Sequence, residues 1–120
     1  MLESKLNKLL ANYAVEYHKL QTLHWYVKDH AFFQTHAKLE DYYNEAYEAV
    51  DEIAEKLRMI GGKPLANLDE FKANATISEA KGEFVTQKQA FATAKADFEQ
   101  LLADVKDIKH DADEEDNYLI

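Results

Sequence analysis

The most constraining feature of the sequence is an unbroken row of apolar residues between positions 39 and 60. Its members alternate in steps of four and three, at Leu39, Tyr43, Ala46, Val50, Ile53, Leu57 and Ile60. That spacing places them on one side of an α-helix. Gly61-Gly62 predicts the end of the helix and Pro64 forbids its continuation, because glycine readily takes the left-handed turn at a helix C-terminus. We expect a helix over about residues 35–61, with Thr35 as its N-cap.

Two further rows with the same alternation predict long helices over about residues 3–28 and 84–110. The first row is Leu2, Leu6, Leu9, Tyr13, Tyr17, Leu20, His24 and Val27. The other row is Phe84, Phe91, Ala94, Phe98, Leu101, Val105 and Ile108. Between the second and third long helices we expect a short helix over about 67–73. The apolar end of the chain indicates the stub of a fourth helix from about residue 114.

These elements predict an all-α protein with a single domain over residues 1–120. Two long helices joined by a short turn form an antiparallel hairpin. Either the chain packs as three helices or its fourth helix is truncated. Because a bundle of four helices closes a core better than three, we expect a four-helix bundle whose fourth helix is truncated in this chain.

Composition narrows the kinds of function. The formal net charge of −9 argues against binding nucleic acid through a basic surface and fits the attraction of cations, although many soluble proteins carry such a charge. The absence of Cys excludes disulfides and thiolate metal sites, so a metal site must use His and carboxylates. Because the sequence has no long apolar run and no signal peptide pattern, we expect a cytoplasmic protein without membrane partners.

The second predicted helix carries a separate polar strip beside its apolar row. The strip is His36, Glu40, Tyr47, Asp51 and Glu55. Asp51 and Glu55 stand one helical turn apart, so both carboxylates can reach one point, where they repel each other unless a cation lies between them. The alternative is a solvated acidic pair, or pairing with Lys56 or Arg58.

Two histidines stand at ligand-capable positions. His36 precedes Glu40 by one helical turn, and His24 lies on the apolar row of the first helix, where a histidine is usually a core residue. Di-iron four-helix proteins usually carry two Glu-x-x-His pairs within one chain, and this sequence has none. A site completed across a two-fold axis, with His24 and His36 from one subunit and the acids from another, is therefore more plausible than a site within one subunit.

Taken together, these residues resemble the Dps family, the mini-ferritins that protect DNA in starved or oxidatively stressed bacteria. The resemblance rests on His24-Trp25, Phe32-Phe33, His36, Val50-Asp51-Glu52-Ile53-Ala54-Glu55-Lys56-Leu57 and Ile60-Gly61-Gly62-Lys63-Pro64. It implies a ferritin-like bundle assembled as a hollow dodecamer, with a ferroxidase centre between two-fold-related subunits. The implied ligands are His24 and His36 from one subunit and Asp51 and Glu55 from its partner, with Glu40 in support and Trp25 adjacent.

The implied activity is oxidation of Fe(II), preferably by hydrogen peroxide, and storage of ferric iron. Zinc or manganese can replace iron at such ligands. The acidic run from Asp111 to Asp116 resembles the segment that lines iron pores in the family, with Asp113 and Asp116 as candidates; a solvated loop that caps a helix is the alternative.

Three departures from the family pattern are visible. The fourth helix is missing, Asp29 stands where relatives usually have Gly, and residues 1–7 contain Lys5 alone instead of a Lys-rich extension. The last departure counts against DNA binding, although association with the bacterial nucleoid stays open. The alternatives to iron storage are a non-enzymatic DNA-compaction protein of the same fold and a helical interaction module without metal.

Overall fold

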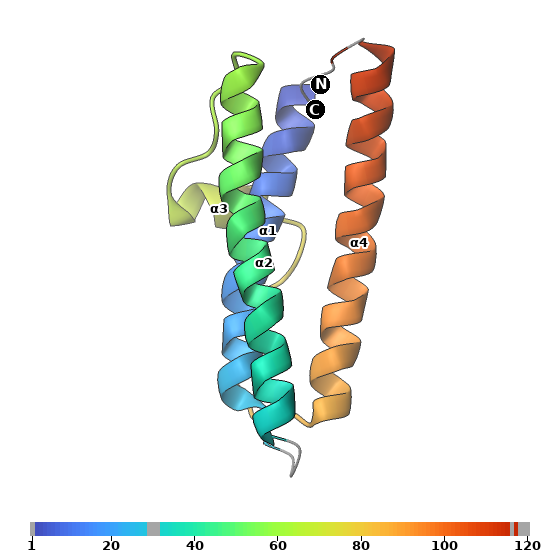
Figure 1. Cartoon of the computed structure of the whole chain (residues 1–120). Coiled ribbons are helices and arrows are strands. Elements are labelled where there is room, and N and C mark those ends of the chain that lie inside the picture. The colour runs from blue at the N-terminus through green and yellow to red at the C-terminus, as the bar shows by residue number, and fades with distance from the viewer. Residues whose placement is uncertain (1, 29–31, 116, 118–120) are drawn as a thin grey trace.

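The computed structural model describes residues 2–28, 32–115 and 117 (Figure 1). This part of the chain is all-α, as predicted, and measures 50 × 26 × 19 Å. Three long helices, α1 (Leu2–Tyr26), α2 (Phe32–Met59) and α4 (Gln87–Glu114), run along the length of the molecule, and the short α3 (Leu68–Asn74) lies against α1. The long helices therefore form the elongated body that carries every predicted site residue within the described ranges.

The ends of α2 and α3 follow local backbone chemistry. Gly61 has a φ of +79°, and the N–H groups of Gly61 and Gly62 donate to the carbonyls of Arg58 and Leu57, which is the Schellman arrangement. This confirms the predicted stop. A reciprocal capping box of Asn67 and Glu70 starts α3.

The start of α2 differs from the prediction. The helix already begins at Phe32, so Thr35 lies buried inside its first turn and is not an N-cap. The His36 side chain bonds to the carbonyl of His24, which holds this first turn against the end of α1. Asp29 and His30 lie outside the described residues.

α4 begins later and ends later than predicted. A capping box of Thr86 and Gln89 sets its start, and Phe84 lies before the helix, where its ring contacts Tyr26. Val85 cannot continue the helix towards Phe84, because its backbone pairs with Tyr26 and Lys28 in a single parallel bridge.

At its other end α4 continues four residues beyond the predicted limit, to Glu114. An ion pair of 2.7 Å between Lys5 and Asp111 holds this last part of α4 against α1. The predicted fourth-helix stub starts inside α4, and residues 118–120 lie outside the described part.

α1 is the centre of the packing, since each of the other helices makes its main contacts with it. Its apolar side chains divide between two core clusters. One cluster is Leu2, Leu6, Leu9, Leu10, Val15, Ile53, Leu57, Ile77, Leu101 and Ile108. The other is Leu20, Leu23, Val27, Leu39, Ala46, Ala90 and Ala94. Buried polar side chains of α1, at Asn12, Glu16 and Lys19, form a polar layer along the same helix.

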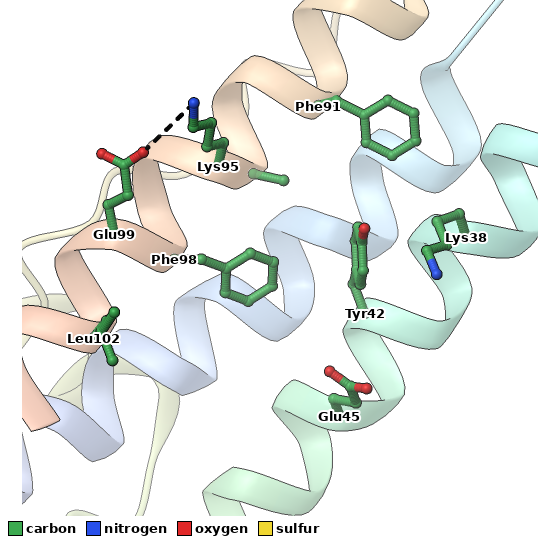
Figure 2. Close-up of a pocket in the computed structure, with 9 residues that line it drawn as sticks. Lys38, Tyr42, Glu45, Phe91, Lys95, Phe98, Glu99 and Leu102 are labelled. Atoms are coloured by element: carbon green, nitrogen blue, oxygen red, sulfur yellow. Dashed lines mark ion pairs between the residues drawn. The ribbon is translucent and has the colours of Figure 1, made fainter.

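α2 and α4 leave an open groove between them (Figure 2). The groove has a volume of about 800 Å³, and Tyr42 of α2 faces Phe91 and Phe98 of α4 across it. Lys38 and Glu45 on α2, and Lys95 and Glu99 on α4, supply its charged lining. None of the helices described combines the length and the apolar character that crossing a bilayer requires.

Candidate metal centre

The end of α1 and the start of α2 bring two imidazoles face to face. The rings of His24 and His36 stack with their centroids 3.4 Å apart and their planes at 19°. His24 is buried at 5% exposure, so its position on the apolar row is a buried one, as the sequence predicted. The His24 ring also lies nearly perpendicular to that of Tyr43, at a centroid distance of 5.3 Å.

Two reciprocal hydrogen bonds fix the orientation of these rings. Nδ1 of His24 donates to the carbonyl of His36 at 2.6 Å, and Nδ1 of His36 donates to the carbonyl of His24 at 2.8 Å. Because a carbonyl oxygen can only accept, each Nδ1 carries a proton, which in a neutral imidazole leaves Nε2 as the ligand atom. In metal sites, a hydrogen bond from the ring nitrogen that does not bind the metal fixes the orientation of a histidine ligand in this way.

Glu40 completes a group of three ligand atoms. Its Oε1 lies 3.9 Å from Nε2 of His24, and ligand atoms of His24, His36 and Glu40 all lie within 4.8 Å of one another. The Glu40 side chain is half exposed, so the group opens to the surface. Two imidazole lone pairs and a carboxylate suit iron, zinc or manganese.

Asp51 and Glu55 lie elsewhere in the same chain. They follow His36 on α2 by at least 15 residues, which corresponds to roughly 22 Å along a helix axis. Both acids are exposed, and a hydrogen bond with Asp51 raises the pKa of Glu55, so the two carboxyl groups do converge as predicted. Asp51 also lines a surface hollow of about 610 Å³ together with Tyr47. The structure thus brings three predicted ligands together and leaves the acid pair apart from them.

The other predicted site residues are placed as follows. Trp25 is 53% exposed, and its ring lies nearly perpendicular to that of His18, with the centroids 6.4 Å apart. Asp113 is exposed in the last turn of α4 rather than in a loop, and Asp116 lies outside the described residues.

One polar cluster escaped the sequence analysis. Glu16 is fully buried, and Lys19 reaches Asp97 of α4 at 2.8 Å. Burial, followed by the neighbouring Asp97, raises the pKa of Glu16 to about 9. As two carboxylates the acids would repel, whereas a proton on Glu16 lets it donate to Asp97. The only signal in the sequence is that Glu16 and Lys19 flank Tyr17 and Leu20 on the apolar row of α1.

Comparison with known proteins places this geometry in a family. The model of the ferritin-like domain matches residues 3–120. "DNA protection during starvation protein 2" of Bacillus anthracis is 38% identical over 113 residues, covering 92% of this chain and 77% of the relative. The chain belongs to the Dps family of ferritin-like proteins.

Solved Dps structures share the fold closely. Dps from Listeria innocua, in crystals soaked with zinc, superposes with a TM-score of 0.91 at 35% identity, covering 98% of this chain and 79% of the other. Dps from Vibrio cholerae, described as a member of a broad superfamily of ferritin-like diiron-carboxylate proteins, gives a TM-score of 0.90 at 30% identity, covering 98% and 76%. The clustered side chains of His24, His36 and Glu40 therefore lie on the fold that these Dps proteins share.

Proposed function

We propose that this Dps-family chain oxidises Fe(II), with hydrogen peroxide as the preferred oxidant, and stores the ferric product inside a homo-oligomeric shell. The observation that carries the proposal is the convergence of His24, His36 and Glu40 at the surface, with both Nδ1 atoms already committed to backbone carbonyls. In this proposal iron is the substrate. The expected shell is a hollow dodecamer in the bacterial cytoplasm.

The proposed centre is shared between two protomers. A two-fold axis that crosses α2 about midway between His36 and Asp51 reverses the helix direction in the partner, so the histidine end of one α2 meets the acid end of the other. Exposed aromatic side chains support contact along this face: Phe33 is 82% exposed and Tyr47 61%. Each such interface would then hold two centres.

The chemistry follows from the ligand types. Carboxylates favour Fe(III) over Fe(II), while imidazoles hold Fe(II) with moderate strength, so the mixed set assists oxidation without trapping the reduced ion. Two irons at one centre supply two electrons, which reduces peroxide to water without releasing hydroxyl radical. Removal of iron and peroxide together would protect DNA without direct contact with it, which is compatible with the net charge of −9.

The proposal is tested by anaerobic loading with Fe(II) followed by addition of peroxide. The parent protein should show a rapid rise in ferric absorbance, and the double variant Asp51→Ala/Glu55→Ala should lose the fast phase while keeping its assembly. The matched control is Asp41→Ala/Glu45→Ala, an exposed acid pair with the same spacing on α2. Oxidation at the parent rate in the first variant would refute the assignment of these ligands.

A further inference from the structure

A continuous row of aromatic rings leads away from the histidine group. Tyr43 lies 5.3 Å from His24, Tyr17 lies 5.9 Å from Tyr43, and Tyr47 lies 5.3 Å from Tyr17, all measured between ring centroids. These separations are within the range of aromatic contact. The row alternates between α2 and α1, so it runs along the hairpin, and its partly buried members Tyr43 and Tyr17 pack against the second core cluster.

The far end of the row reaches the acid end of α2. Tyr47 is 61% exposed and lines the same hollow as Asp51. Under the proposed function, that hollow receives the histidines of the partner and becomes the second centre of the interface. The aromatic row therefore connects one centre to the other within a single protomer. Without the row, the two ends of α2 would be separated by a gap of roughly 22 Å along the helix axis.

We propose that Tyr43, Tyr17 and Tyr47 form an electron relay between the two iron centres of one interface. The inference rests on the proposed function, since it requires Fe(II) at both ends. Electron transfer slows steeply with distance, and three ring-to-ring steps replace one long step. Phenols are suitable carriers because they lose an electron and a proton together, and the exposed Tyr47 can release its proton to water.

The relay matters when a centre holds one iron only. Peroxide then takes one electron from Fe(II) and one from a tyrosine: Fe(II) + TyrOH + H2O2 + H+ gives Fe(III) + TyrO• + 2 H2O. Fe(II) at the distant centre reduces the radical: TyrO• + Fe(II) + H+ gives TyrOH + Fe(III). The sum is the same two-electron reduction of peroxide by two Fe(II) ions, with the ions in different centres and no hydroxyl radical released.

The alternative role of these rings is packing, which a tyrosine and a phenylalanine fulfil equally well. Tyr17→Phe removes the phenol from the middle of the row and keeps the ring. Tyr42→Phe is the matched control, because Tyr42 contacts Phe91 and Phe98 on the other side of α2. A purely structural role predicts the same behaviour for both variants.

The experiment compares two iron loadings of the assembled protein, each followed by anaerobic addition of peroxide. At one Fe(II) per centre, the parent and Tyr42→Phe should give a tyrosyl radical in electron paramagnetic resonance and close to two Fe(III) per peroxide reduced. Tyr17→Phe interrupts the row between the two centres, so it should shift towards one Fe(III) per peroxide and release spin-trapped hydroxyl radical. At full loading all three proteins should oxidise iron at the same rate, because each centre then supplies both electrons.

The outcomes separate the relay from the function on which it rests. Absence of iron oxidation in the parent at full loading overturns the proposed function. Normal oxidation at full loading, with equal radical yield and stoichiometry in Tyr17→Phe and the parent at low loading, overturns the relay alone. A radical confined to Trp25 in the parent also overturns the relay.

Discussion

Two polar clusters on α1 face different helices, one towards α4 and the other towards α2, and their charged and polar groups are paired in different ways. Towards α4, the buried Lys19 forms an ion pair with the partly buried Asp97, and burial beside Asp97 raises the pKa of Glu16 to about 9, which favours a proton on Glu16. Towards α2, the Nδ1 atoms of His24 and His36 bond to backbone carbonyls, and ligand atoms of both residues lie close to the half-exposed Glu40. The first cluster joins groups of opposite charge within the protomer, whereas the second brings together three side chains of the types that bind metal ions.

This difference separates a structural polar cluster from a functional one. A buried ion pair contributes little net stability, yet breaking it is costly because one charge is left without a partner. An exposed group of electron-pair donors costs little to maintain and gains energy only when a ligand arrives. Substitutions in the two clusters should therefore affect opposite properties, folding in the first and metal binding in the second.

The largest expected effect is the pH dependence created by Glu16. Its pKa of about 9 in the folded protein lies far above the usual 4.5, so the folded state keeps a proton that the unfolded state releases. Stability should fall as pH rises from about 5 to 9, by up to roughly 1.4 kcal/mol per pH unit, and level off above pH 9. Glu16→Gln should remove this contribution, because its amide still donates to Asp97.

Urea unfolding at a series of pH values measures this effect as the difference between the two proteins. The variant should gain stability relative to the parent with each step towards alkaline pH. Parallel pH curves would mean that Glu16 is ionised in the folded protein or exposed to water.

The next effect concerns the lysine of the same cluster. Lys19→Met leaves the Asp97 carboxylate buried without its counter-charge and should cost about 3–5 kcal/mol of unfolding free energy. The control is Lys95→Met, since Lys95 pairs with Glu99 on the open surface, where ion pairs contribute little. Equal losses of unfolding free energy in both variants would show that the buried and the exposed ion pair contribute alike to stability.

A smaller loss should follow from Asn12→Ala. The buried Asn12 Oδ1 accepts from the backbone N–H groups of Thr76 and Ile77, at 2.7 and 3.1 Å, and so fastens the loop before α4 to α1. Leaving these donors without partners should cost about 2–3 kcal/mol and speed hydrogen exchange at both amides. Substitution of the exposed Asn44, as Asn44→Ala, serves as the control. Unchanged hydrogen exchange in Asn12→Ala would show that the loop keeps its conformation without Asn12.

The smallest expected effect on folding comes from the histidine group. His36→Ala loses the hydrogen bond to the carbonyl of His24 and the ring stacking on His24, and should cost about 1–2 kcal/mol in the metal-free protein. Its effect on metal binding should be much larger: excess zinc should stabilise the parent and the control His110→Ala, and should leave His36→Ala unchanged. Thermal unfolding with and without zinc measures both quantities, and a zinc shift retained in His36→Ala would place the metal elsewhere.

The sequence was sufficient where local spacing decides the structure. The apolar row of α2, its stop at Gly61 and the exposed strip with Glu40 and Asp51 all follow from positions along one helix. The sequence was insufficient where a contact with a distant segment determines the local structure. The pairing of Val85 with the end of α1 moved the start of α4, although the apolar spacing continues back to Phe84.

The candidate site shows the same division. His36 and Glu40 one turn apart are visible in the sequence, whereas the reciprocal bonds that set the tautomers depend on the packing of α1 against α2. Glu16 and Lys19 resemble ordinary charged helix residues, and only the packing of α4 buries them. A metal centre that contains both His36 and Asp51 requires a second protomer and therefore stays a prediction.

Mixing two inactive variants tests that shared centre most directly. One variant carries His24→Ala/His36→Ala and the other Asp51→Ala/Glu55→Ala, and the two are unfolded and reassembled together. In a mixed dimer one centre lacks both histidines and the acid pair, and the other centre keeps all of them, so ferroxidase activity should return to about a quarter of the parent value. Mixed assemblies that form but stay as inactive as each variant alone would contradict a centre shared between protomers.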